Sequence, residues 1–397
     1  MCKQRQNKYD AVIVGAGMIG LSTAKAMLDL NLDVAIVEKK PPDLSWDKSI
    51  IAKRVSAINR RSEFFLKTIG VWDNILNNID NGVAYDKMEI WENDILDRLE
   101  FNAIDVGETE LGYIIENRIL IKELWELIFS QNIQPYYSHI SDISGDPGDW
   151  TITLSSGELI RCELIIGCDG GNSWVRDFFS FDTSIKPYNH HALIATVHVD
   201  GCNESTAFQR FLKTGPLAFL PTAKPHIYSI VWSISGDRYK ELINLTDSDF
   251  NCELNKIMSD RLGKCQIISS KLSFPLFERH SKSYYKNGVV LVGDAAHTIH
   301  PLAGQGVNLG FNDVKFLIKA LSKAKDSDRS LWHYSTLANY ERRVRLFNSS
   351  MVLSMKAIKE VFSNENDYIM KGRAVGIKLL NKFTLGKSIL IKIAMGK

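Results

Sequence analysis

A βαβ unit near the N-terminus restricts the fold of this chain more than any other feature. An apolar run at Ala11–Val14 is followed by the GxGxxG segment Gly15–Gly20 and by a helix-like segment. A second apolar run, Val34–Val37, ends in Glu38. Two short strands joined by a helix that starts at a glycine-rich turn are typical of a dinucleotide-binding site, and the acidic residue stands at the expected distance.

Each residue of this unit has a chemical role that explains its type. We expect Gly15 to allow a tight turn and Gly17 to let the backbone approach a pyrophosphate. Gly20 lets the helix pack closely on the strand, and Glu38 can accept hydrogen bonds from ribose hydroxyls. A secretory signal is an alternative interpretation, because basic residues precede an apolar run and Ala24–Ala26 imitates a cleavage site. Cleavage there would destroy the glycine unit, so we favour the nucleotide site.

A second cofactor signal lies at Val289–Asp313. The apolar run Val289–Val292 has the length and β-branching of a buried parallel strand, and a helix is expected from near Val307. Between them Asp294 can accept hydrogen bonds from sugar-like hydroxyls, and free N–H groups at the helix start favour an anion. An ordinary surface turn is the alternative. It explains one or two glycines, but not the whole set of Gly293, Gly304, Gly306 and Gly310 around Asp294, Pro301 and Asn308.

Composition excludes several other classes of protein. The chain has 397 residues and a formal net charge of +2, so it carries no general nucleic-acid footprint and is long enough for two or more packed domains. No apolar run approaches the roughly 20 residues of a membrane helix. Six cysteines form no CxxC pair, which favours a reduced, cytoplasmic compartment. The close histidine pairs, His190–His191 and His297/His300, lack a third ligand, so we expect no metal site.

The pattern of apolar residues predicts an α/β fold with an inserted sheet. We expect a Rossmann-like nucleotide-binding domain, a mainly antiparallel β-sheet substrate domain, and a C-terminal helical segment. The texture becomes β-rich from Phe181 to His280 and helical again from Asn308, where an apolar stripe runs at helical spacing. Core packing is the usual role of such a stripe, with a dimer interface as the alternative. The predicted limits are 7–72, 102–180 and 281–340 for the first domain, 73–101 and 181–280 for the second, and 341–397 for the third.

Three motifs in this order resemble those of the flavoprotein aromatic hydroxylases, which are single-component FAD monooxygenases. They are the Gly15–Gly20 unit with Glu38, the segment Cys168–Arg176, and Gly293-Asp294 with its continuation. Finer features are similar to the branch of ubiquinone-biosynthesis hydroxylases. These are Arg54–Asn59, Ile69–Trp72, Glu116–Arg118, Gln209–Phe211, Gly215–Ala218, Val231–Trp232 and the HxxxPxxGQGxNxG run from His297 to Gly310.

The resemblance implies roles for particular residues. Asp294 is expected to bind the ribityl–pyrophosphate region of FAD. Backbone N–H groups of Gly306, Val307 and Asn308 are expected to meet the pyrimidine end of the flavin, where reduced flavin is negative. Further residues implied by the family are Asp169 and Arg176 for FAD and NAD(P)H, Arg54 and Arg118 on the flavin side, and Pro301 with Gly304 at the oxygen-reacting face. For Arg118 a surface ion pair is an equal alternative.

The resemblance also implies the reaction. Reduced FAD would react with dioxygen to a flavin hydroperoxide, which would pass one oxygen atom to the aromatic ring of a polyprenylated phenol or quinone precursor. NAD(P)H would be the reductant, and no acid–base side chain is assigned. We further expect the Phe181–His280 sheet to cover the reactive face of the flavin and, with Met88–Phe101, to shape the substrate pocket, on the basis of four apolar residues of that sheet. They are Phe211, Leu217, Phe219 and Trp232.

Three alternatives stay open at this level. One is an FAD-dependent oxidase or reductase of another hydrophobic substrate, and another is a non-catalytic flavin-bound scaffold of a biosynthetic complex. The third concerns location. The segment Lys371–Lys397 mixes apolar residues with lysines and has no acidic residue, so it fits a peripheral segment on the inner membrane face as well as an element packed on the core.

Overall fold

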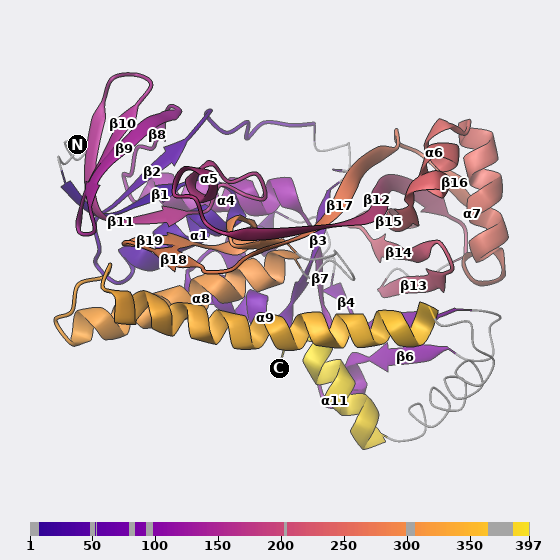
Figure 1. The fold of residues 1–397 in the computed structure, drawn as a ribbon. Helices are drawn as coiled ribbons and strands as arrows, with labels where there is room; N and C mark the ends of the chain where they lie inside the picture. Colours follow the sequence, from indigo (N-terminus) through magenta and orange to yellow (C-terminus); the bar gives the residue numbers. More distant parts are fainter. Residues whose placement is uncertain are drawn as a thin grey trace.

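The structure is a computed structural model. It describes residues 8–47, 52, 54–78, 84–92, 98–201, 205–298, 306–363 and 384–396. Figure 1 shows two lobes joined by two long strands, with helices along one side of the molecule.

The first lobe is built on a sheet whose central strands are parallel, in the order β18-β19-β11-β1-β2-β8. Its middle strand β1 (Lys8–Val14) pairs in parallel with β2 (Val34–Glu38) and with β11 (Leu159–Gly167), and β11 pairs in parallel with β19 (Val289–Leu291). The remaining strands are β8 (Tyr136–Tyr137), β9 (Ile140–Asp146), β10 (Asp149–Leu154) and β18 (Tyr285–Lys286). Buried strands with near-continuous apolar sequence are what a parallel sheet covered on both faces requires.

Helices cover this sheet and complete its core. Helix α1 packs against both α4 and α8, and α8 packs against α9. One apolar core includes side chains of the sheet together with those of α1, α4, α8 and the first half of α9. The bounds are α1 (Met18–Leu28), α4 (Asn117–Ser130), α5 (Trp174–Phe178), the 3-10 turn η2 (Gly293–Ala295), α8 (Gly306–Asp326) and α9 (Tyr334–Ser363).

The second lobe is a mainly antiparallel sheet in the order β20-β17-β12-β15-β14-β13-β5-β6. Its strands are β5 (Lys87–Trp91), β6 (Leu99–Asn102), β12 (Thr183–Val199), β13 (Thr206–Leu212), β14 (Gly215–Pro221), β15 (Ile227–Ser235), β16 (Cys265–Ile267), β17 (Leu272–Ser281) and β20 (His297–Thr298). Helices α6 (Gly236–Asn244) and α7 (Asp247–Leu262) cover one face and share a separate apolar core with it. The long strands β12 and β17 connect the two lobes (Figure 1).

A third, small sheet and the C-terminal helix complete the described fold. The small sheet has the order β3-β7-β4, with β3 (Val55–Asn59), β7 (Gly112–Glu116) and β4 (Ala84–Tyr85). Helices α2 (Arg60–Thr68) and α3 (Trp72–Asn77) follow β3, and the 3-10 turn η1 (Ala103–Val106) follows β6. Helix α11 (Thr384–Ala394) packs on β6 and η1 and projects from the body in Figure 1.

The predicted α/β fold with an inserted antiparallel sheet and C-terminal helices is confirmed. The domain limits given above stay a prediction. None of the helices within the described ranges is long and apolar enough to cross a membrane.

Candidate cofactor site

The three glycines of the β1–α1 loop differ in what surrounds them. Gly15 has a φ of +98°, and a Cβ atom there would lie 2.6 Å from the carbonyl oxygen of Cys168. At Gly20 a Cβ atom would lie 1.9 Å from the carbonyl oxygen of Gly15. At Gly17, by contrast, it would meet nothing within 4 Å. Gly15 and Gly20 therefore allow close backbone packing, while Gly17 leaves the start of α1 open to a ligand.

Glu38 lies where the sequence placed it, at the end of β2 beside this loop. One carboxylate oxygen accepts a hydrogen bond from the Ala16 N–H at 2.7 Å, and the other accepts from the Lys39 N–H at 2.7 Å. The carboxylate thus faces the glycine loop. Its predicted bonds to ribose hydroxyls stay a prediction.

Asp294 lies in the turn η2, directly after β19. Its side chain is open to solvent and is nevertheless crowded by protein atoms, which is the position of a group in a recess. Burial raises the pKa of the Asp294 carboxyl, and Asp313 adds to this, while His297 and Arg279 oppose it. A recessed carboxylate beside an open helix start suits the hydroxyl-rich chain that joins flavin to pyrophosphate.

The start of α8 is the second open helix end. A Cβ atom at Gly306 would meet no atom of the described residues within 4 Å, and the Val307 side chain is half-buried against the core of the first lobe. The Asn308 amide is buried; it donates to the Ala57 carbonyl oxygen at 2.7 Å and accepts from the Asn59 N–H at 3.1 Å. These two bonds fix the first turn of α8 on β3, so its backbone N–H groups have a defined direction. Pro301 and Gly304 lie outside the described residues.

The two loops meet on one side chain of α1. A Cβ atom at Gly310 would lie 2.6 Å from Cδ1 of Ile19, and one at Gly293 would lie 3.3 Å from Cγ2 of Ile19. Both glycines therefore let the Asp294 turn and α8 pack directly on α1. The two motifs, almost 280 residues apart in the sequence, form one site.

A buried polar group beneath Asp294 was missed by the sequence analysis. The carboxylate of Asp313 accepts from the Gly293 N–H at 3.0 Å and pairs with Nε2 of His297 at 2.5 Å. The Asn348 side chain, from α9, also contacts Nε2 of His297 at 2.9 Å. Burial lowers the pKa of His297, but Asp313 and Asp294 outweigh this, so the pKa is raised. This buried network fixes the turn that carries Asp294.

The middle motif connects the same two loops. Oδ2 of Asp169 accepts from the Val175 N–H at 3.1 Å, and burial raises the pKa of this carboxyl. Arg176 is buried and donates to the carbonyl oxygens of Gly171 at 3.0 Å and Ala295 at 3.2 Å. Arg176 thus ties the motif to the turn that carries Asp294. Contacts of Asp169 or Arg176 with FAD or NAD(P)H stay a prediction.

The two other arginines lie on aromatic rings. The Arg54 guanidinium lies over the Phe274 ring at 4.2 Å, which joins the first lobe to β17. Arg118 donates to a carboxylate oxygen of Glu116 at 2.6 Å and lies 4.9 Å from the Trp46 ring. The ion pair that was the alternative for Arg118 is therefore present. Nothing tests the predicted flavin contacts of either arginine.

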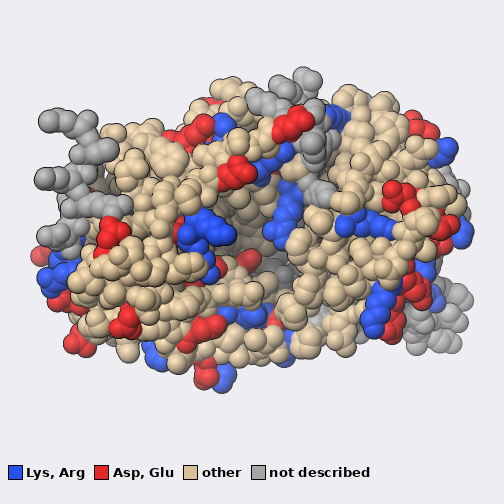
Figure 2. Space-filling model, turned by 90° about the horizontal axis from the view of Figure 1, so that it is seen from above, with Lys and Arg blue, Asp and Glu red and all other residues tan. Residues whose placement is uncertain are grey.

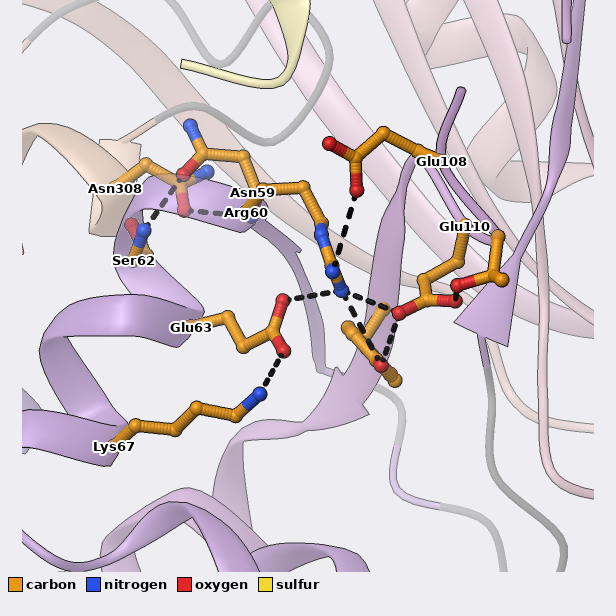
Figure 3. Close-up of polar contacts among 10 residues, drawn as sticks. Asn59, Arg60, Ser62, Glu63, Lys67, Glu108, Glu110 and Asn308 are labelled. Atoms are coloured by element: carbon orange, nitrogen blue, oxygen red, sulfur yellow. Dashed lines mark hydrogen bonds and ion pairs between the residues drawn. The ribbon is translucent and has the colours of Figure 1, made fainter. Parts of the chain in front are cut away.

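A charged cluster next to Asn308 was also missed (Figure 3). Arg60, the first residue of α2, pairs with Glu63 at 2.6 Å, with Glu108 at 3.6 Å, and with Glu110. Asn59, directly before it, caps α2 by accepting from the Ser62 N–H and donates its own N–H to Asn308. The cluster anchors the element against which the first turn of α8 is fixed. The Arg60–Glu63 pair has the i,i+3 spacing of a helix, but Glu108 and Glu110 come from the η1–β7 connection, so no local sequence pattern joins them to Arg60.

The residues present fit FAD. Two open helix starts, at Gly17 and Gly306, supply N–H groups and positive helix ends for phosphate and for reduced flavin. Asp294 and Glu38 supply acceptors for hydroxyls. Figure 2 shows the molecule hollowed between the two lobes, with basic side chains along the sides of the hollow.

The predicted pocket residues of the second lobe need a correction. Leu217, Phe219 and Trp232 lie in the closed core with α6 and α7 and do not face the first lobe. Strand residues alternate between faces, and the register of β14 on β15 pairs Leu217 with Trp232 on the face that the helices cover. Phe211 lies on the opposite face, because it pairs with Pro216 one register step away.

Comparison with known proteins identifies the family. A model of the FAD binding domain matches residues 8–352. The chain belongs to the FAD-binding domain family. FAD is therefore its cofactor, and the predicted membership of the FAD monooxygenases is confirmed.

The relatives cover nearly the whole chain. It is 32% identical over 389 residues to the 3-demethoxyubiquinol 3-hydroxylase of Escherichia coli, with 98% of each chain covered. It is 30% identical to the ubiquinone biosynthesis monooxygenase COQ6 of Xenopus tropicalis, with 97% of this chain and 93% of the relative covered. A solved structure with the same fold is that of pqsL, a probable FAD-dependent monooxygenase from Pseudomonas aeruginosa. Its TM-score is 0.79 at 20% identity, with 94% of this chain and 99% of that chain covered.

Proposed function

We propose that this protein inserts one oxygen atom of O2 into the aromatic ring of a polyprenylated phenol or quinol precursor of ubiquinone. The observation that carries the proposal is the 32% identity, over 98% of both chains, to a 3-demethoxyubiquinol 3-hydroxylase. A site of two open helix starts with Asp294 in a recess supports it, because that site suits FAD.

The chain's own residues position the cofactor and the substrate. Bound FAD would supply the oxygen chemistry. The start of α8, fixed on β3 by Asn308, would hold the pyrimidine end of the flavin and stabilise its negative charge when reduced. Asp294 would bind the ribityl hydroxyls. The face of the second sheet that looks toward the first lobe would exclude water from the reacting atoms.

NAD(P)H is the reductant in this proposal. Several arginines lie near the site. One of them, Arg279, attracts the Asp294 carboxylate and so opposes the rise that burial causes in the pKa of that carboxyl. Purified protein reduced anaerobically with NADPH or with NADH, and followed by the loss of flavin absorption, identifies the donor. Failure of both would leave another electron donor as the physiological one.

Oxygen labelling separates hydroxylation from the alternative functions. The purified enzyme is supplied with 18O2, the reductant and a short-tailed phenol, and the product is analysed by mass spectrometry. One 18O atom in the ring supports the proposal. A product that contains no oxygen from O2 would indicate an oxidase or reductase, and no flavin reduction by any donor would indicate a scaffold.

Deletion of the gene identifies the substrate that the enzyme uses in the cell. We expect the strain to accumulate a polyprenylated precursor that lacks one ring hydroxyl, and its mass spectrum gives the ring position. Wild-type quinone composition in the deletion strain would overturn the assignment.

We also propose that α11 contacts an anionic lipid surface, since a polyprenylated substrate is insoluble in water. One side of α11 is packed, with Ile391 and Met395 buried beside Leu99 and Phe101. The other side exposes Ile389 and Ile393 at 59% and 48%, separated by the exposed Lys392. An apolar helix face with a basic residue suits an interfacial position.

Introducing two acidic side chains on the outer side of α11 tests this. The double variant Ile389→Glu/Ile393→Glu is expected to lose flotation with anionic vesicles while its melting temperature stays the same. Leu159→Glu is a matched control, because Leu159 is 65% exposed at the start of β11. Unchanged flotation of the double variant would show that α11 only packs on the core.

A further inference from the structure

The two faces of the second sheet are closed by different parts of the molecule. On one face, Leu193 and Trp232 lie in the core with α6 and α7. Because residues opposite each other in paired strands share a face, the strand register assigns every other residue to the opposite face.

Two contacts show that the opposite face looks toward the first lobe, and a third shows that α11 covers its far edge. Leu220 packs on the core of the first lobe. Phe274, opposite Ala192, lies under the Arg54 guanidinium. Leu99, at the far edge of the sheet, packs against Ile391 of α11. The middle of this face is therefore enclosed between the two lobes.

One row across this face contains a single polar side chain. The register places Ile194 opposite Val231, Val231 opposite Ala218, and Ala218 opposite Gln209. Gln209 in turn lies opposite Ile90. The row is thus apolar at every position except Gln209, which lies between Ala218 and Ile90.

Gln209 is buried and has no internal reason to be polar. Its exposed fraction is 5%, and its amide makes no hydrogen bond within the part of the chain that the structure describes. Its polar atoms are nevertheless not among the fully enclosed ones that lack a partner, so the amide reaches the space beside this face and can bind a ligand there. Two of its neighbours on the same face are small, because Ala218 lies opposite it and Ala207 lies two residues before it on the strand. The other two, Ile90 and Phe211, are large and apolar.

We propose that the Gln209 amide forms a hydrogen bond with an oxygen substituent on the aromatic ring of the substrate and so sets which ring position faces the flavin. An amide both donates and accepts hydrogen bonds, so it can bind a hydroxyl or a methoxy oxygen. The small side chains beside it leave space for a flat ring, and the apolar row continues along both sides. The inference rests on the proposed function, and it adds the residue that recognises the oxygen substituent.

If the Gln209 amide binds this oxygen, replacing Gln209 by leucine should affect the binding of ligands with and without an oxygen substituent differently. Gln209→Leu keeps the size and removes the hydrogen bonds. The dissociation constant of 2-pentylphenol, followed by the change in flavin absorption, is expected to rise about tenfold. Binding of pentylbenzene, which has no ring oxygen, is expected to stay the same or to tighten.

Stability without substrate separates recognition from a structural role. Because the amide makes no hydrogen bond with the described residues, Gln209→Leu is expected to leave the melting temperature of the flavin-loaded enzyme unchanged or to raise it. A structural role for the amide would lower it. Gln266→Leu is the matched control on β16, where the side chain is exposed, and it should change neither binding nor melting.

The outcomes distinguish this inference from the function on which it rests. A wild-type enzyme that hydroxylates 2-pentylphenol, with a Gln209→Leu variant that binds it equally well, would overturn the inference and leave the function standing. A lower melting temperature with equal loss of both ligands would also overturn it. A wild-type enzyme that neither binds nor hydroxylates any phenol would overturn the function and the inference together.

Discussion

The two loops of the cofactor site are held in place by different forces. The β1–α1 loop depends on backbone contact, because Gly20 lies against the Gly15 carbonyl oxygen and Gly15 against Cys168. The Asp294 turn depends on buried polar groups, because Asp313 binds the Gly293 N–H and pairs with His297. The first loop should therefore respond to added volume, and the second to charge and pH.

The largest expected effect comes from volume in the first loop. Gly20→Ala would place a Cβ atom 1.9 Å from a backbone oxygen, which no side-chain rotation relieves. We expect a loss of at least about 3 kcal/mol in the free energy of unfolding, measured by urea denaturation, or no folded protein at all. A variant with wild-type stability would contradict the steric account of this loop.

The next effect comes from charge in the second loop. Asp313→Asn removes the buried carboxylate that pairs with His297 and is expected to cost about 3 kcal/mol, because it leaves a buried polar network unbalanced. Asp326→Asn, at the exposed end of the same helix, is the control. It should change the free energy of unfolding by no more than about 0.5 kcal/mol. Equal stability of the two variants would show that the pair does not hold the turn.

Gly17→Ala sharpens the contrast within the first loop. The added methyl group would meet no protein atom, and the φ of −75° suits any residue, so stability should stay near that of the wild type. FAD affinity, measured by titration of the apoprotein, should fall at least about tenfold, because the methyl group occupies the approach to the pyrophosphate. Undiminished affinity would remove Gly17 from the site.

The smallest effect is a pH dependence that only the second loop should show. The folded state raises the pKa of His297, so its stabilising contribution is fully present below the unfolded pKa of about 6.5 and is lost as pH rises through the folded value. The stability difference between wild type and His297→Gln should therefore shrink from pH 6 to 8.5, by at most about 1.4 kcal/mol per pH unit. The exposed His139→Gln serves as control. A difference that grows with pH would contradict the sign.

Local motifs made the first loop predictable from the sequence. Gly15, Gly17, Gly20 and Glu38 lie within 24 residues, and their spacing alone states the contacts that they make. The strand before Asp294 and the helix start near Val307 were predictable for the same reason. The support of the second loop was not, because Asn348 reaches His297 only through the way in which α9 packs on α8.

Alternation of apolar residues was insufficient for the second sheet. β15 carries Trp232 on one face and Val231 between two serines, Ser229 and Ser233, on the other. Both faces are largely buried, so alternation alone does not say which face meets the helices. The register with neighbouring strands decides this, and it reverses the prediction for Leu217, Phe219 and Trp232. The same register brings out Gln209, which its motif neighbours alone did not distinguish from a core residue.

The flavin content of purified Asp294→Ala tests the central claim most directly, namely that the two distant loops form one FAD site. Asp294 lies in a recess of the second loop and makes no side-chain contact on which the described fold depends. We predict that the variant keeps its melting temperature as apoprotein and loses most of its FAD, measured as the ratio of absorbance at 450 nm to that at 280 nm, a spectroscopic ratio compared directly with the wild type. Full flavin occupancy in a folded Asp294→Ala protein would contradict the account.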